Sequence, residues 1–128
     1  MMLIKDLLTR PILTIPTGST IKEAAELMSA HGLSYILIIN SRKEIIGILT
    51  ERDVTKAVAK GIPYTEKVDS LMTKTIITVR DNEDLVDALN LMLRNSIRHL
   101  VVIDSNDRFI GVISIRDVAQ ALGLMYDY

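Results

Sequence analysis

Cysteine and tryptophan are absent from the 128 residues of this chain, and aromatic residues make up only 4% of it. Without cysteine there are no disulfides, no thiolate nucleophiles and no cysteine-ligated zinc, which agrees with a reducing intracellular setting. Hydrophobic residues nevertheless make up 48% of the chain. We therefore expect an aliphatic core of isoleucine, leucine, valine and methionine, in a chain the size of one ordinary domain.

An excess of charge of one sign and long apolar runs are also missing. The chain has 15 basic and 16 acidic residues, a balance that leaves no electrostatic footprint for nucleic acid and no polybasic tail for a membrane. The longest apolar runs are as short as Tyr35–Ile39, whereas a transmembrane helix needs roughly 20 residues. The N-terminus has no signal-like apolar region. We expect a cytoplasmic protein without a membrane partner, and the charge balance argues against a nucleic-acid partner.

What the chain does contain is an internal repeat. Sliding the sequence by 64 positions aligns Ile4–Val58 with Val68–Leu122 without a gap. Identical pairs include Leu7/Leu71, Ile12/Ile76, Thr14/Thr78, Ala24/Ala88, Leu27/Leu91, Met28/Met92, Ile39/Ile103, Gly47/Gly111, Arg52/Arg116, Asp53/Asp117 and Val54/Val118. We assign residues 4–60 to the first repeat, 61–67 to a linker and 68–124 to the second repeat. Each repeat is too short to be stable alone.

Each repeat is expected to fold in the order β-α-β-β-α, which predicts a mixed α/β (α+β) protein. In the first repeat Thr20 and Glu23 form a capping box at the start of a helix that ends at His31-Gly32. The other expected elements are extended segments at Ile12–Ile15, Tyr35–Ile39 and Glu44–Leu49 and a second helix at Thr50–Lys60. We expect the two repeats to pack through their sheets about an approximate two-fold axis, which creates two similar crevices for small ligands.

A short motif closes each repeat: an apolar run with a glycine, then a hydroxyl residue, two further residues and Asp. It reads IGILTERDV at Ile46–Val54 and IGVISIRDV at Ile110–Val118. One interpretation is a helix cap, because Ser or Thr followed three residues later by an acid forms a capping box. The other is a nucleotide site, because a carboxylate binds a ribose diol and an arginine binds phosphate. The residues alone leave both open.

The repeated motif resembles that of a cystathionine-β-synthase (CBS) domain pair, also called a Bateman module. The resemblance covers Ile4 to about Leu122 and occurs twice in register. It implies a regulatory module, without catalytic residues, metal or required cofactor, that binds an adenosine-containing ligand such as AMP, ADP or ATP. It also implies a homodimer, which transmits the binding event to a regulated protein that the sequence does not identify.

The same resemblance assigns candidate binding residues by position. The ribose would be held by Asp53 and Asp117, together with the hydroxyl residues Thr50 and Ser114. The base would be lined by Ile12, Leu13, Thr14, Ile48, Ile76, Ile77, Thr78 and Val112. In many family members a proline follows the first residue pair of the long strand, and here those positions hold Leu37 and Val101.

Phosphates in this family often reach residues of the opposite repeat. For the crevice of Asp53 the resemblance implies Arg98, His99 and Arg116, and for the crevice of Asp117 it implies Ser34, Tyr35 and Arg52. Two other hypotheses remain besides nucleotide sensing. One is a ligand-free protein–protein interaction module in which both motifs only cap helices, and the weaker one is nucleic-acid binding.

The unequal number of cations predicts that the crevice of Asp53 binds the more highly phosphorylated nucleotide, or binds AMP more tightly. Arg98→Ala is expected to weaken nucleotide binding more than Ser34→Ala, the substitution at the equivalent position of the first repeat. Titration calorimetry with AMP and ATP measures both variants. Equal losses of affinity would show that the cations do not distinguish the two crevices.

Overall fold

The structure, a computed structural model, describes residues 1–8 and 12–124 and divides the chain into two compact units. We call residues 13–76 the first unit, and residues 1–12 together with 77–128 the second unit. The first unit contains β1 (Thr14–Pro16), α1 (Ile21–His31), β2 (Tyr35–Ile39), β3 (Ile45–Thr50), α2 (Glu51–Ala59) and the 3-10 helix η2 (Val68–Ser70). The second contains η1 (Ile4–Leu7), β4 (Thr78–Arg80), α3 (Leu85–Arg94), β5 (His99–Ile103), β6 (Phe109–Ser114) and α4 (Ile115–Ala121).

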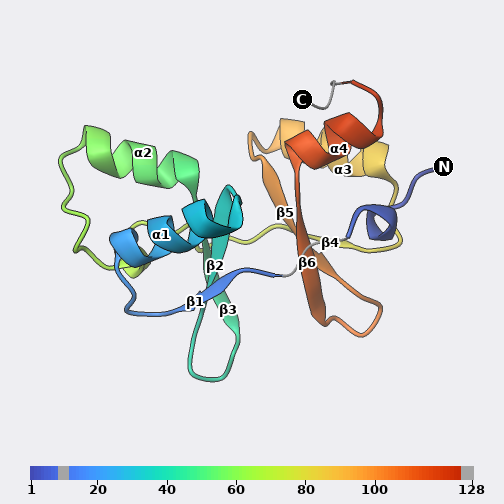
Figure 1. Cartoon of the computed structure of the whole chain (residues 1–128). Helices are drawn as coiled ribbons and strands as arrows, with labels where there is room; N and C mark the ends of the chain where they lie inside the picture. Colours follow the sequence, from blue (N-terminus) through green and yellow to red (C-terminus); the bar gives the residue numbers. More distant parts are fainter. Residues whose placement is uncertain (9–11, 125–128) are drawn as a thin grey trace. The chain divides into compact units, whose positions relative to one another are not determined.

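Each unit is built on a three-stranded sheet whose middle strand is the second strand of the repeat. β1 runs parallel to β2, and β2 pairs antiparallel with β3. The second unit repeats this order with β4, β5 and β6. The predicted β-α-β-β-α order and the α+β class are therefore confirmed, and Figure 1 shows two helices beside each sheet.

The helices begin and end where the capping signals predict. Thr20 caps α1: its hydroxyl oxygen accepts a hydrogen bond from the Glu23 N–H at 3.1 Å, and Glu23 Oε1 accepts one from the Thr20 N–H at 3.2 Å. Gly32 ends the helix with a φ of 62°, in the left-handed region that suits glycine. In the second unit the side chain of Asp84 caps α3 by accepting from the Val86 N–H at 2.7 Å.

One face of each sheet packs against its helices and forms an aliphatic core, as the low aromatic content predicts. Alternate residues of a strand point to opposite faces, so Ile36 and Ile38 of β2 enter this core while Leu37 points the other way. The core of the first unit consists of Leu13, Ile15, Ala24, Met28, Ile36, Ile38, Leu49 and Val68. The core of the second unit consists of Ile4, Val79, Leu85, Ala88, Met92, Leu100, Val102, Ile113 and Val118.

The N-terminal segment of each repeat packs in the unit of the other repeat, which the sequence analysis did not predict. Ile4 is fully buried in the core of the second unit, and Val68 is fully buried in the core of the first. Their backbones are held alike, because the Ile4 N–H donates to the Glu83 oxygen at 3.0 Å and the Val68 N–H donates to the Ser19 oxygen at 2.8 Å. Figure 1 shows the blue N-terminal turn beside β4–β6.

The motif glycines are required where these exchanged segments cross the sheets. A Cβ at Gly47 would lie 2.7 Å from Cγ and 3.1 Å from Cβ of Met72, and even closer to its sulfur. A Cβ at Gly111 would lie 2.8 Å from Cδ2 of Leu8, with the next atoms of that side chain at 3.8 Å or beyond. Each glycine also adjoins a shift in strand register, as expected for a bulge.

Asp69 ties the second of these segments to the turn between β1 and α1. Its carboxylate accepts one hydrogen bond from the Thr17 hydroxyl and another from the Gly18 N–H, the latter at 2.8 Å. These two hydrogen bonds lower the pKa of the Asp69 carboxyl below its ordinary value, and the hydrogen bond from Thr17 has the larger effect. The anion is therefore the form that the folded state favours.

Gly47→Ala is expected to destabilise the protein more than Gly111→Ala. At Gly47 three atoms of Met72 must move, which costs about 1–3 kcal/mol, whereas at Gly111 rotation of one leucine methyl relieves the overlap. Urea unfolding of the two variants gives the comparison. Adding Met72→Ala to Gly47→Ala should cost less than the sum of the single substitutions, and additive losses would contradict the packing explanation.

Asp69→Asn is expected to destabilise the protein at pH 7 by about 1 kcal/mol or less, the size of an ordinary hydrogen bond at a partly solvated site. Because the folded pKa of Asp69 is lowered, its contribution is complete above the unfolded pKa near 4 and is lost as pH falls through the folded value. Urea unfolding at pH 7 and pH 3 measures this.

The control for Asp69→Asn is Glu66→Gln. Glu66 lies in the same segment, and in the described part of the chain only its backbone is hydrogen-bonded, to Pro63 and Ile21. We expect the difference in free energy of unfolding between Asp69→Asn and the wild type to be smaller at pH 3 than at pH 7. A pH-independent difference, or an equal effect of Glu66→Gln, would refute the role of the Asp69 carboxylate.

Candidate functional site

The strand register gathers several predicted binding residues on the sheet face that points away from the helices. In the first unit Thr14 pairs with Leu37, which pairs with Ile48, and Tyr35 pairs with Thr50. Residues paired across strands share a face, and so do residues two apart on one strand. We call these five residues the Thr14 face. The equivalent Thr78 face of the second unit consists of Thr78, His99, Val101, Val112 and Ser114.

The backbone at the edge of the Thr14 face is available for recognition. β1 is an edge strand, and the carbonyl oxygen of Leu13 accepts a hydrogen bond from the Leu37 N–H at 3.0 Å. Because alternate residues of an edge strand direct their backbone groups toward the neighbouring strand, the N–H and C=O of Thr14 point to the unpaired side. Thr78 has the same position, since the Ile77 oxygen accepts from the Val101 N–H at 3.2 Å.

At the opposite edge, the backbone of Ile48 already has partners. Its N–H donates to the Thr73 oxygen at 3.0 Å, and its oxygen accepts from the Thr73 N–H at 2.9 Å. Ile48 can therefore offer a ligand only its side chain. The face thus has an apolar middle formed by Leu37 and Ile48, with a backbone donor and acceptor at the Thr14 edge.

The motif aspartate of the first unit lies at the end of this face. Asp53 Oδ2 accepts hydrogen bonds from the Thr50 N–H at 2.9 Å and the Thr50 hydroxyl at 3.2 Å, while the Asp53 N–H donates to Thr50 Oγ1 at 3.4 Å. This is the capping box that the helix-cap interpretation of the motif predicts. It occupies one carboxylate oxygen, and no residue in the described ranges hydrogen-bonds to Oδ1.

The second unit repeats the arrangement with slightly different contacts. Asp117 Oδ2 accepts from the Ser114 N–H at 3.1 Å, and the Asp117 N–H donates to Ser114 Oγ at 3.1 Å. Asp53 and Asp117 are both half-buried. The predicted capping boxes are thus confirmed, and in each box one carboxylate oxygen has no partner among residues 1–8 and 12–124.

The two apolar segments that were predicted to line the base divide between the core and the face. The side chains of Leu13 and Ile77 belong to or pack against the cores of their units, because they alternate with the outward-pointing Thr14 and Thr78. Their side chains therefore face the core, while their backbones border the face, and the prediction that they line the base stays a prediction. Ile12 and Ile76 are half-buried and lie where the chain passes between the units.

The residues predicted to hold phosphate lie close to the motif of their own repeat. Ser34 precedes β2 and its oxygen accepts from the Glu51 N–H at 3.0 Å, just as the Arg98 oxygen accepts from the Ile115 N–H at 2.8 Å. Tyr35 and His99 are paired with the motif hydroxyl residues in the strand register. Arg52, Arg98 and Arg116 are exposed. That these residues bind the phosphates of a ligand held by the opposite repeat stays a prediction.

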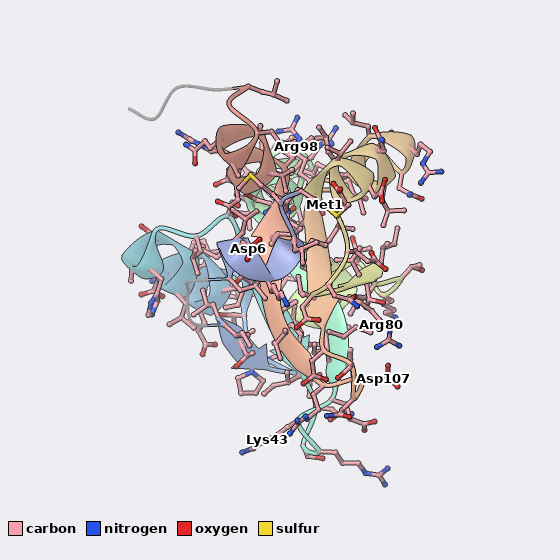
Figure 2. The ribbon with its side chains drawn as sticks, turned by 90° about the vertical axis from the view of Figure 1, so that its right-hand side faces the viewer. Met1, Asp6, Lys43, Arg80, Arg98 and Asp107 are labelled. Atoms are coloured by element: carbon pink, nitrogen blue, oxygen red, sulfur yellow. The ribbon has the colours of Figure 1, made fainter. Side chains whose placement is uncertain are left out.

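A further arginine of the second unit serves a structural purpose. Arg80 donates to the Asp104 oxygen at 2.8 Å and forms an ion pair with Asp107 at 2.6 Å. Figure 2 shows this pair at the β5–β6 turn, far from Arg98 at the other end of β5. Within the described residues there is no group of three or more His, Asp or Glu side chains that could bind a metal ion. None of the described helices is long and apolar enough to cross a membrane.

Sequence reasoning missed the central residues of both faces. Leu37 and Val101 sit between the predicted edge residues and are buried. Their period-two alternation with the core residues of the same strand was a usable signal. The contact of Thr73 with Ile48 carried no such signal, because it depends on the exchange of N-terminal segments.

Comparison with known proteins gives the family. The family model of the CBS domain matches the chain twice, at residues 4–60 and 68–124. An uncharacterized 17.7 kDa protein from Acidianus ambivalens is 38% identical over 119 residues, which cover 93% of this chain and 72% of that protein. Homoserine O-acetyltransferase from Methanococcoides burtonii is 32% identical over 120 residues, but the match spans only 24% of that enzyme.

Solved structures with the same fold include two with bound ligands. The CBS domain protein PAE2072 from Pyrobaculum aerophilum, complexed with AMP, is 29% identical with a TM-score of 0.85, over 96% of this chain and 98% of that one. The CBS domain pair of protein MJ0100, in complex with 5-methylthioadenosine and S-adenosyl-L-methionine, is 26% identical with a TM-score of 0.86, over 95% and 96%. The resemblance drawn from the repeated motif is confirmed: this chain belongs to the CBS domain family and carries two copies of the domain.

Proposed function

We propose that this protein is a regulatory module that binds adenosine-containing ligands through the Thr14 and Thr78 faces. The observation that carries the proposal is the position of Asp53 and Asp117. Each places a half-buried carboxylate, with one oxygen left by the cap, at the end of an apolar sheet face. The ligands of the two similar solved structures, AMP and S-adenosylmethionine with methylthioadenosine, share the adenosine group.

The chemistry of each face fits the parts of adenosine. An adenine ring presents an amino donor next to a ring-nitrogen acceptor, which match the C=O and N–H of Thr14 on the unpaired edge of β1. Leu37 and Ile48 supply apolar contact for the ring. The remaining oxygen of Asp53 accepts from the ribose hydroxyls, and hydrogen bonds to a charged group contribute about 1.5–3 kcal/mol each.

Phosphate groups would be bound by the exposed arginines near the motifs. Arg52, Arg98 and Arg116 offer fork-shaped donors that suit phosphate, with His99, Tyr35 and Ser34 as further hydrogen-bonding partners. We keep the expectation that these groups serve the ligand of the opposite repeat. Adenine nucleotides would then act as regulatory ligands rather than as cofactors of a reaction, and we expect no catalysis.

Regulation would follow from linkage between ligand binding and conformation. A ligand that binds one arrangement of the protein more tightly shifts the population toward it. We expect a homodimer and a regulated protein partner that responds to this shift. The alternative function is a ligand-free protein–protein interaction module, which the complete capping boxes at Thr50–Asp53 and Ser114–Asp117 favour.

Asp53→Ala and Asp117→Ala are expected to reduce the stabilisation of the protein by AMP, each at its own site. In the wild type, AMP at 100 times its Kd should raise the free energy of unfolding by about 2.7 kcal/mol for each site, or several °C in Tm. Both variants also lose a cap, which lowers the Tm without ligand by an amount equivalent to about 1 kcal/mol. Thermal unfolding with and without AMP separates the two effects.

Glu23→Ala is the matched control. Glu23 completes the same kind of capping box on α1. Its partner Thr20 lies in the loop before that helix, whereas Thr50, the partner of Asp53, lies on a strand of the Thr14 face. It should lower the Tm of the free protein and leave the AMP-induced shift intact. If all three variants lost the AMP-induced rise in Tm equally, the aspartates would act only as helix caps. No shift in the wild type with AMP, ATP or S-adenosylmethionine would favour the interaction module.

A further inference from the structure

The two sheet faces are related position by position but differ consistently in the size of their side chains. At every position where they differ, the residue of the Thr78 face has the smaller side chain. The pairs are Leu37/Val101, Ile48/Val112, Tyr35/His99 and Thr50/Ser114. Three of these exchanges remove one carbon each, and the fourth replaces a phenol by the smaller imidazole. The fifth pair, Thr14/Thr78, is identical.

The backbones that carry these residues have the same register. Thr14, Leu37 and Ile48 form one row across the first sheet, as Thr78, Val101 and Val112 do across the second. The register shift falls at equivalent positions in both sheets, after Ile38 and Val102. The faces therefore differ in side-chain volume and not in the path of the strands.

At two of the four pairs that differ in size, the smaller side chain is also the more exposed. Ile48 and Tyr35 are buried, whereas their counterparts Val112 and His99 are half-buried. Thr14 is half-buried and Thr78 is exposed. The Thr78 face is thus the more exposed at three of its five positions, and at the Thr14/Thr78 pair this difference does not come from side-chain size.

The backbone and the first side-chain torsion of Ile48 are constrained. Both of its backbone hydrogen bonds go to Thr73, and a β-branched side chain has a restricted χ1 angle. Its neighbour Gly47 is held under Met72. The extra carbon of Ile48 relative to Val112 is its δ-methyl group, which adds volume to the Thr14 face on a backbone that is held in place.

We propose that the two faces select adenosine ligands by the size of the base, with Ile48/Val112 and Leu37/Val101 as the specificity-determining pairs. The Thr14 face accepts an unsubstituted adenine, and the Thr78 face also accepts a purine that carries one additional small substituent. This inference rests on the proposed function, because it assumes that adenosine binds at both faces. One methylene group in an apolar pocket changes relative affinity by about 10- to 200-fold.

The test measures a ratio, the Kd of a methylated adenosine divided by the Kd of adenosine. The probes are adenosine and its 2-methyl, N6-methyl and 8-methyl derivatives. Titration calorimetry measures the Kd of each. Asp53→Ala leaves the Thr78 face to be measured, and Asp117→Ala leaves the Thr14 face. If either variant shows a melting temperature too low for titration, Asp53→Asn or Asp117→Asn replaces it, because the amide keeps an acceptor for the cap.

For at least one derivative we expect a ratio near one at the Thr78 face and above ten at the Thr14 face. Val101→Leu with Val112→Ile should then raise the ratio at the Thr78 face at least tenfold, and Leu37→Val with Ile48→Val should lower it at the Thr14 face by a similar factor. A general loss of affinity or stability cancels in the ratio, so these reciprocal changes report size selection specifically.

Two negative results have different meanings. If adenosine binds both faces but the ratios are equal, or if the exchanged pairs leave them unchanged, size selection is refuted and the proposed function stands. If adenosine, AMP and S-adenosylmethionine fail to bind the wild-type protein at millimolar concentration, the proposed function is refuted and size selection falls with it.

Discussion

The exchange of N-terminal segments is the constraint on which the rest of the structure depends. Ile4 and Val68 are the equivalent residues of the two repeats, and each is fully buried in the core of the other repeat's unit. A repeat of this length buries too little apolar surface to be stable alone. Because each core is completed by a residue from the other repeat, the two halves of the chain are expected to fold together.

This exchange also positions the candidate sites. Met72 crosses its sheet at Gly47 and Leu8 crosses its sheet at Gly111, so the motif glycine provides space for the segment. The following residues lead directly into Thr50 or Ser114 and the capped aspartate. The glycine and the aspartate of one motif therefore have separate functions: the glycine admits the segment from the other repeat, and the aspartate caps the helix while keeping one oxygen available.

Much of the fold could be predicted because its signals are local. The capping box at Thr20, the left-handed Gly32 and the alternation along Tyr35–Ile39 depend on residues close together in the chain, and the repeat supplied each signal a second time. The candidate site was harder to predict. Leu13 lies next to Thr14 in the sequence, yet its side chain enters the core, because neighbouring strand residues point to opposite faces.

The sequence by itself determined the two-fold repetition, the order of elements, the capped motifs and the aliphatic nature of the core, because these depend on short-range patterns and composition. Only the tertiary structure decided that each repeat completes its core with a segment from the other and that Thr73 occupies the backbone of Ile48. The physical reason is that both are contacts between residues far apart in the chain, and short-range patterns carry no information on which distant segment fills a core or pairs with a strand edge.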